Sequence, residues 1–317
     1  IKMNKKAVIF GIKSYKLSNL EKKFLKKEKP WGIILFSRNI KNINQLRHLV
    51  KGIKALFGQK DYPILIDQEG GAVSRLNKII NLNIFTQAYF GQLYKRDKVS
   101  FYSYFKIYIN SVCSILNFIG ININTVPVLD VRRIKSHKII GSRSFSTDPS
   151  LVSKLGKLTV NLYTNNNIAT VVKHIPGHGL SKSDSHYKTP VIKAKKNELM
   201  KKDFLPFKNS KSLFAMTAHI LYEKYDKFNV ATHSKEIIKQ IIRKHMSYKG
   251  LIISDDISMK SLKLGLENNA LKALQAGCNL VLHCNGNIKE MSRLAKVIPK
   301  IDNFTQKKTT QFYKFLR

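Results

Sequence analysis

Short apolar runs rich in β-branched residues alternate with longer amphipathic segments along most of this 317-residue chain. A run such as Trp31–Phe36 is apolar at almost every position, which is typical of strands that helices cover on both faces. The pattern predicts eight strands, at Ala7–Gly11, Gly32–Phe36, Pro63–Asp67, Asn122–Asp130, Thr170–Pro176, Leu213–Ile220, Gly250–Asp255 and Asn279–Cys284.

The segments between these runs have the periodicity of helices that bury one face. We expect Ser234 to cap one of them and Gly277 to end another, because these residue types favour the two ends of a helix. The helices are predicted at Ile43–Phe57, Ser100–Phe118, Leu151–Asn166, Ser234–Tyr248, Leu266–Ala276, Ile288–Ile298 and Asn303–Arg317.

Strands alternating with helices predict an α/β fold, either a closed (β/α)8 barrel of the TIM type or an open doubly wound sheet. The dinucleotide-binding version of the open sheet is disfavoured, because no G-x-G-x-x-G motif follows any predicted strand. The sequence has no internal repeat and no low-complexity linker. We therefore expect a single domain that spans residues 1–317.

Polar residues capable of chemistry gather where the predicted strands end, and this favours the barrel. The active sites of such barrels lie at the C-terminal ends of the strands, where side chains from different strands converge. The residues in these positions are Asp67, Asp130, Lys173, His174, His219, Asp255, Asp256, His283 and Asn285.

The most distinctive of these segments is Lys173-His-Ile-Pro-Gly-His-Gly179. Its proline and glycines predict a sharp turn directly after the strand, which would bring Lys173 and His174 close to a ligand. Lysine can donate hydrogen bonds to sugar hydroxyls, and histidine can donate or accept them. The alternative is a strand-end histidine that is satisfied by a neighbouring group.

A polar loop follows, with Asp184 and His186 two residues apart. A carboxylate on one imidazole nitrogen fixes the tautomer and raises the basicity of the ring, as a general acid/base requires. The alternatives are a loop aspartate that caps a turn, and a zinc site formed by His174, His178 and His186. The zinc spacing is a poor match, since the intervening Ile-Pro-Gly is incompatible with a helix. We expect no metal and no cofactor.

The segment Ser254-Asp-Asp-Ile-Ser-Met259 ends the seventh predicted strand. We expect Asp255, as the last strand residue, to reach the pocket, and Asp256 to order the turn that follows. Arg75 and Arg143 carry forked donors that suit a carboxylate or an amide carbonyl.

The net charge of +38 would by itself suggest a nucleic-acid-binding protein. Its lysines are spread along the whole chain, however, and the sequence contains no recognised nucleic-acid-binding motif, so we expect no specific nucleic acid partner. Three cysteines without a C-x-x-C pair fit a reducing compartment. With no apolar stretch of membrane-spanning length and no signal peptide in Ile1–Gly11, the expectation is a cytoplasmic monomer without a membrane partner.

The motifs together resemble the bacterial β-N-acetylglucosaminidases of glycoside hydrolase family 3, the single-domain type of peptidoglycan recycling. The resemblance covers residues 32 to about 285, and the pair K-H-x-P-G-H-G and S-D-D-x-S-M is its most specific part. The matching runs are G-I-I-L-F-S-R-N from Gly32, D-Q-E-G-G from Asp67, P-V-L-D-V from Pro127, S-R-S-F-S-T-D-P from Ser142, K-H-I-P-G-H-G from Lys173, D-S-H from Asp184 and S-D-D-I-S-M from Ser254.

The resemblance implies a retaining enzyme that removes terminal N-acetylglucosamine from small peptidoglycan-derived sugars. Asp255 would be the nucleophile and His186 the acid/base, with Asp184 as its partner. The residues implied to bind the sugar are Asp67, Arg75, Arg143, Lys173 and His174.

Two positions depart from the family pattern: Ala72, where relatives often carry arginine, and Ser142, where many carry glutamate. Both flank matched binding residues and bear on affinity more than on reaction type. Two alternatives stay open: a basic nucleic-acid- or surface-binding barrel without turnover, and a phosphorylase in which phosphate replaces water. Phosphorolysis is included because a neutral histidine tolerates an anionic acceptor.

Overall fold

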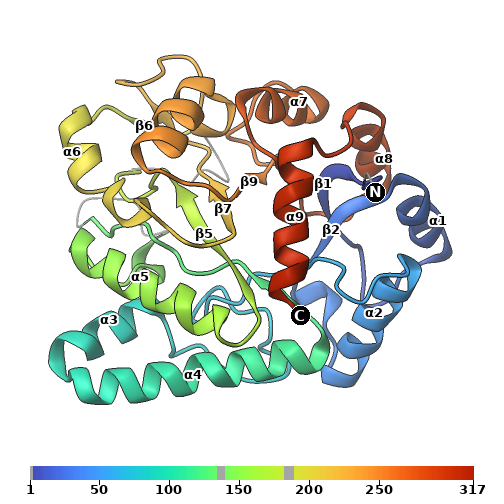
Figure 1. Cartoon of the computed structure of the whole chain (residues 1–317), viewed down its shortest axis with the longest axis horizontal. Coiled ribbons are helices and arrows are strands. Elements are labelled where there is room, and N and C mark those ends of the chain that lie inside the picture. Colours follow the sequence, from blue (N-terminus) through green and yellow to red (C-terminus); the bar gives the residue numbers. More distant parts are fainter. Residues whose placement is uncertain (1–2, 134–139, 182–188) are drawn as a thin grey trace.

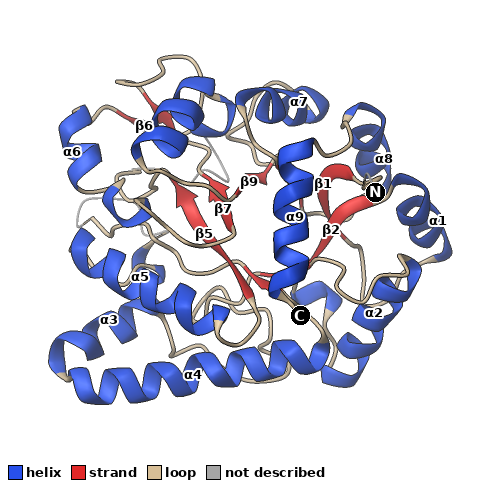
Figure 2. Ribbon diagram, viewed as in Figure 1, coloured by secondary structure: helices blue, strands red, loops and turns tan. Residues whose placement is uncertain are grey.

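In the computed structural model, residues 3–133, 140–181 and 189–317 are described. Eight parallel strands close into a barrel in the order β1-β10-β9-β7-β5-β4-β3-β2, which confirms the predicted TIM-type fold. Figures 1 and 2 show the helices arranged around these strands. The barrel strands are β1 Lys6–Gly11, β2 Pro30–Leu35, β3 Ile64–Ile66, β4 Ile123–Asn124, β5 Ala169–Ile175, β7 Phe214–Thr217, β9 Leu251–Asp256 and β10 Leu280–His283.

All eight barrel strands fall within or beside the predicted runs, and all seven predicted helical segments contain a helix. Ser234 accepts a hydrogen bond from the Ile237 N–H at 3.1 Å, and Gly277 ends its helix with a φ of 118°, as expected. The helices are α1 Asn19–Glu28, α2 Ile43–Leu56, α3 Gln87–Arg96, α4 Lys98–Ile119, α5 Pro149–Thr164, α6 Lys196–Lys201, η5 Ile237–His245, α7 Leu266–Ala276, α8 Ile288–Val297 and α9 Asn303–Phe315. Shorter helical turns are η1 Ser37–Asn39, η2 Gly141–Arg143, η3 Leu205–Phe207 and η4 Ala231–His233.

Several elements differ from the sequence prediction. Helices α1, α3 and α6 were not predicted, nor was the small sheet formed by β6 (Val191–Ile192) and β8 (Leu221–Tyr222). In α1 only Glu21 and Leu25 are buried, so the chain there lacks a strong apolar periodicity. Its start is fixed instead by a capping box between Ser18 and Glu21.

Strand β4 is much shorter than the predicted Asn122–Asp130. The buried side chains of Asn122 and Asn124 accept hydrogen bonds from the N–H groups of Ile64 and Gln68, each at 2.9 Å. Side chains therefore make part of the contact between this segment and β3. In addition, Pro127 has no N–H with which to continue the backbone hydrogen bonds of a strand. A bridge between Val128 and Lys173 keeps the chain beside β5 up to Asp130.

Helix α9 covers the N-terminal end of the barrel and lies across the strands in Figures 1 and 2. The Phe312 ring lies 6.2 Å from the Trp31 ring and 5.5 Å from the Phe214 ring, at the starts of β2 and β7. The Trp31 indole also donates to the Thr309 hydroxyl at 2.8 Å. The opposite, C-terminal end of the barrel is therefore the end available for a site. None of the described helices combines the length and apolarity needed to cross a membrane.

Candidate active site

The C-terminal ends of β3, β5 and β9 bring the described site residues together. Asp67 directly follows β3, Lys173 and His174 lie in β5, and Asp255 lies in β9. Lys173 contacts Asp67 directly, and Asp255 interacts electrostatically with both Lys173 and His174. Positions far apart in the sequence thus meet at one end of the barrel, as the strand-end pattern predicted.

A cluster of five charged side chains, which we call the ion cluster, forms one side of this site. Lys173 Nζ lies 2.6 Å from Glu69 Oε1 and 3.2 Å from Asp67 Oδ1. Arg143 holds Glu69 with two nearly parallel hydrogen bonds of 2.8 and 2.9 Å, and Arg75 lies 3.3 Å from Asp67. Three cations surround two carboxylates, so the cluster carries an excess positive charge.

Within the ion cluster, Lys173 and Glu69 are buried, whereas Asp67 and Arg75 are partly exposed. The Lys173 ammonium group also donates to the Thr125 hydroxyl at 2.9 Å, so all three of its N–H donors have partners. A direct hydrogen bond from Lys173 to a sugar would have to replace one of them. Asp67 and Arg75 are better placed to contact a ligand.

The two carboxylates of the ion cluster are held ionised. Burial alone would raise the pKa of Glu69, but the charges of Arg143 and Lys173 prevail and lower it to about 2. The pKa of Asp67 is likewise lowered well below its ordinary range, since Lys173, Arg75 and a hydrogen bond from Thr125 outweigh its burial. Neither group is therefore expected to serve as a proton donor near neutral pH.

Replacing Glu69 with alanine is expected to lower the free energy of unfolding by roughly 3–5 kcal/mol, because buried Lys173 would lose one partner and Arg143 its carboxylate. Chemical denaturation at pH 7 measures the loss. Glu69→Gln, which keeps the size and some hydrogen bonds, should lose less. If both variants unfolded like the wild type, the ion cluster would not stabilise the fold.

The same interaction predicts a pH dependence. The folded pKa of Glu69 is about 2, below the unfolded value of about 4.3. Its stabilisation is therefore fully present above the unfolded pKa and is lost as the pH falls from there towards about 2. Glu69→Gln should show a smaller decrease in stability than the wild type over this interval.

A second buried group fixes the orientation of His174. Asp130 lies 2.7 Å from His174 Nδ1 and accepts the His178 N–H at 2.6 Å. Although burial alone would raise the pKa of Asp130, His174 and His178 lower it. An ionised carboxylate can only accept, so Nδ1 carries the proton and Nε2 is left as the atom that can face a ligand. Within the described part of the chain, no side chain or carbonyl is hydrogen-bonded to this Nε2.

The two neighbouring aspartates at the end of β9 have different surroundings. Asp256 accepts from the Ser258 N–H at 3.1 Å and from the Ser258 hydroxyl at 2.8 Å, so it orders the turn after the strand. One oxygen of Asp255 accepts the Asp256 N–H at 2.8 Å. No hydrogen bond from a described residue reaches its other oxygen. The strand extends through Asp256, one residue beyond the predicted end.

The surroundings of Asp255 also favour its ionised form. Burial alone would raise its pKa, but His219, His174, the Asp256 N–H and Lys173 together lower it. His219 Nε2 lies 3.0 Å from the Asp256 carbonyl oxygen, and its Nδ1 lies 2.6 Å from the Thr232 hydroxyl. Because a carbonyl only accepts, Nε2 carries a proton and His219 anchors the backbone beside Asp255. An ionised, partly exposed carboxylate at a barrel mouth is suited to nucleophilic attack.

The turn after β5 needs its glycines for reasons the structure makes explicit. Gly177 has a φ of 140°, and a Cβ there would lie 2.7 Å from the Asp203 carbonyl oxygen. At Gly179, a Cβ would collide with the Val131 carbonyl oxygen. The turn is thus packed closely against the backbone at Val131 and Asp203. The predicted residues Asp184 and His186 lie outside the described residues, and His186 is also the third histidine of the zinc alternative.

Comparison with known proteins identifies the family. Residues 3–311 match the glycosyl hydrolase family 3 N-terminal domain. This chain belongs to glycoside hydrolase family 3. Its family 3 relatives include the β-hexosaminidase of Haemophilus influenzae, which is 31% identical over 88% of this chain and 79% of its own length. The β-hexosaminidase of Psychromonas ingrahamii is 31% identical over 96% of this chain and 88% of its own length.

Solved structures of family 3 agree with these sequence relatives. NagZ from Neisseria gonorrhoeae, in complex with N-trifluoroacetyl-D-glucosamine, superimposes with a TM-score of 0.87. It is 29% identical, with 99% of this chain and 90% of that chain covered. The chain is therefore a glycoside hydrolase of the β-N-acetylhexosaminidase type. The alternative of a barrel that binds without turnover is not favoured.

The two departures from the family 3 pattern leave the ion cluster intact. Ala72 and Ser142 are both exposed, and the neighbouring Arg143 makes its paired contacts with Glu69. The paired contact between Arg143 and Glu69 is therefore formed without an arginine at position 72 or a glutamate at position 142. Any effect on affinity would have to arise at the surface of the site.

Four buried residues of the site were not among the predicted site residues: Glu69, Asp130, His178 and His219. Asp130 and His219 lie at predicted strand ends, and that position was the sequence feature that could have indicated them as site residues. Glu69 lies inside the D-Q-E-G-G motif, and its role becomes visible only through Arg143, 74 residues away. His178 is buried, and burial lowers its pKa to about 4 against the opposing charge of Asp130, so it is neutral at pH 7.

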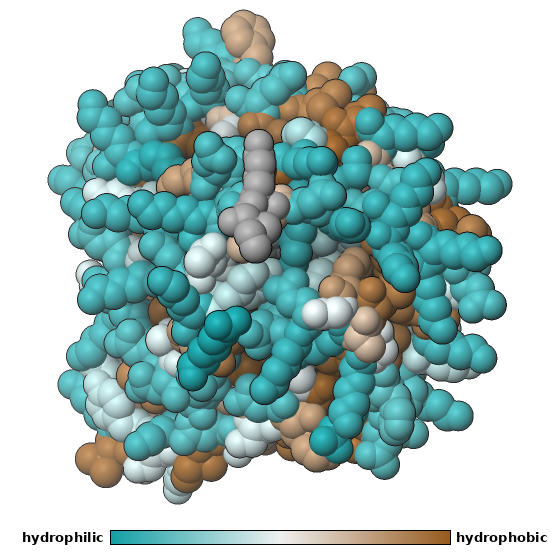
Figure 3. Space-filling model, turned by 45° about the vertical axis from the view of Figure 1, so that its right-hand side comes forward, coloured by the Kyte–Doolittle hydropathy of each residue, from teal (hydrophilic) through white to brown (hydrophobic). Residues whose placement is uncertain are grey.

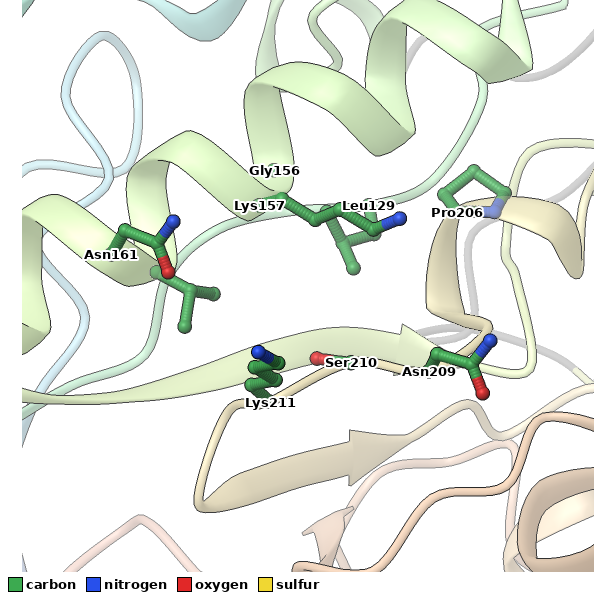
Figure 4. A pocket seen from close by; sticks show the side chains of 9 residues that line it. Leu129, Gly156, Lys157, Asn161, Pro206, Asn209, Ser210 and Lys211 are labelled. Atoms are coloured by element: carbon green, nitrogen blue, oxygen red, sulfur yellow. The ribbon is translucent and has the colours of Figure 1, made fainter.

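Not every hollow of the molecule belongs to this site. The pocket in Figure 4 has a volume of about 290 Å³ and lies between α5 and the segment after η3. Its lining includes Lys157 and Lys211 but none of the predicted site residues.

Hydrophilic side chains cover most of the face shown in Figure 3, in keeping with lysines that are spread along the chain.

Proposed function

We propose that this enzyme is a retaining exo-β-N-acetylglucosaminidase that acts on peptidoglycan-derived anhydromuropeptides in cytoplasmic cell-wall recycling. In this proposal residues 1–317 act as one catalytic domain. The observation that carries the mechanism is the ionised Asp255, which offers an oxygen without a hydrogen-bond partner among the described residues. The identity of the sugar is supported by the β-hexosaminidase relatives.

In the first step Asp255 attacks the anomeric carbon while the bond from that carbon to the leaving oxygen breaks. His186 gives its proton to that oxygen, so the leaving group departs as a neutral alcohol. Asp184 orients the imidazole. In the second step His186 takes a proton from water, the water oxygen bonds to the anomeric carbon, and the Asp255 carboxylate is released.

The ion cluster and the Asp130–His174 pair would bind the sugar in this scheme. The partly exposed Asp67 and Arg75 would meet its hydroxyl groups, and His174 Nε2 would add a contact from β5. Lys173 and Arg143 would act from beneath, by holding the carboxylates of Asp67 and Glu69 in place. The positive charge of Lys173 also helps to keep Asp255 ionised.

The test is product analysis with an N-acetylglucosaminyl-anhydromuropeptide, with and without phosphate. The proposal expects free N-acetylglucosamine, released first as the β-anomer, at a rate that phosphate does not change. Formation of N-acetylglucosamine 1-phosphate would make the enzyme a phosphorylase. Initial release of the α-anomer would exclude the covalent route.

A further inference from the structure

A second cavity lies at the same end of the barrel as Asp255, between the loop after β1 and the loop after β10. Its volume of about 650 Å³ falls in the range of small-molecule sites. Side chains from both loops line it, chiefly Lys13, Lys16, Ser18, Asn285, Asn287 and Lys289.

This cavity adjoins the catalytic centre through short contacts. The Cys284 N–H lies 3.4 Å from the Asp256 carboxylate, next to Asp255, and the cavity lining begins at the following residue, Asn285. Arg38 joins the two loops by donating to the carbonyl oxygens of Ile12, at 2.9 Å, and Cys284. A ligand that extends from Asp255 past the end of β10 would therefore reach this cavity.

The cavity offers positive charge that the protein does not neutralise. Lys13, Lys16 and Lys289 are exposed, and none of them forms an ion pair with a described residue. The carboxylate that lines the cavity, Glu21, is buried and accepts from the Lys13 N–H at 3.1 Å and the Ser18 N–H at 2.9 Å. Three ammonium groups are thus available to an anionic ligand.

The nearby carboxylate and the two helix starts are already satisfied. Glu290 lies 2.8 Å from His283 Nε2 and accepts from the Asn285 amide at 2.7 Å. Helices α1 and α8 begin with capped N-termini, because Ser18 accepts from the Glu21 N–H and Asn287 from the Lys289 N–H. Binding in the cavity would therefore come from the lysine side chains.

We infer that this cavity binds the carboxylates of the peptide carried by the leaving group. The inference rests on the proposed function, which supplies a substrate with an anionic peptide. The ion cluster comes from β5 and from the segments after β3 and β4, and these three strands lie across the barrel from β10. With the N-acetylglucosamine ring on that side and its anomeric carbon at Asp255, the leaving group continues towards the three lysines.

The test is calorimetric binding of the released anhydro-N-acetylmuramyl peptide at low salt, which needs no turnover. Lys13→Ala, Lys16→Ala and Lys289→Ala together should weaken binding about tenfold, as expected for three partly exposed ion pairs. Conversion of the ligand carboxylates to methyl esters should weaken binding to the wild type by a similar factor. Higher salt should reduce the difference.

The matched control removes three exposed lysines elsewhere, Lys51, Lys95 and Lys106, and so lowers the net charge by the same amount. Its affinity should stay within about twofold of the wild type. Equal weakening in the two triple variants, or no preference for the carboxylate ligand over its ester, would overturn the inference. Release of p-nitrophenol from its N-acetyl-β-D-glucosaminide by the wild type, measured in parallel, tests the proposed function separately.

Discussion

Asp255→Ala is expected to reduce release of p-nitrophenol from its N-acetyl-β-D-glucosaminide by roughly 10⁴-fold or more, because removal of a nucleophile removes the covalent route. The fold should survive, since Asp255 makes one hydrogen bond with a described residue, to the adjacent Asp256 N–H. Steady-state kinetics measure the loss, and thermal unfolding verifies that the variant is folded.

Asp256→Ala is the matched control for this experiment. Asp256 contacts Ser258 and the Cys284 N–H, so its loss should disturb the turn after β9 and reduce activity far less than Asp255→Ala. The reverse ranking would assign the nucleophile to Asp256. Substantial turnover in both variants would contradict a nucleophile at the end of β9.

His186→Ala is expected to slow hydrolysis of an N-acetylglucosaminyl-anhydromuropeptide by roughly 10²–10⁴-fold, the usual contribution of a general acid/base. The loss on the p-nitrophenyl glycoside should be smaller in the first step, because p-nitrophenol is a good leaving group without protonation. The ratio of kcat/KM on the two substrates, wild type against variant, is the measurement.

His186→Ala should also lose the limb of the pH–rate profile that arises from titration of the His186 imidazole. Asp184→Ala keeps the imidazole, so it should shift that limb and retain more activity than His186→Ala. Equal losses of His186→Ala on both substrates, with an unchanged pH profile, would count against an acid role for His186.

Most of the barrel could be predicted because its strands are covered on both faces and therefore consist of almost unbroken apolar runs. In β2 and β5 every residue is buried. β4 could not be predicted to its full extent, since its pairing depends on the side chains of Asn122 and Asn124, which replace part of the backbone ladder. Helix α1 depends on its capping box more than on an apolar face.

The position of the candidate site in the barrel could be predicted from the sequence, but the contacts between its side chains could not. Strand-end polarity indicated Asp67, Lys173, His174 and Asp255, because parallel strands in a barrel end at the same face. The pairing of Glu69 with Arg143 could not be predicted from the local sequence, since the two residues lie in separate loops. The different environments of Asp255 and Asp256 likewise depend on contacts with Ser258 and Cys284.

The central claim is that Asp255 becomes covalently bound to N-acetylglucosamine during turnover. A fluorinated N-acetylglucosaminyl donor with a good leaving group slows the second step, so the intermediate accumulates and can be located by peptide mass spectrometry. The account predicts one sugar per chain, attached to Asp255 and absent from Asp255→Ala. An adduct on another residue, or no adduct in an enzyme that turns over the donor, would contradict it.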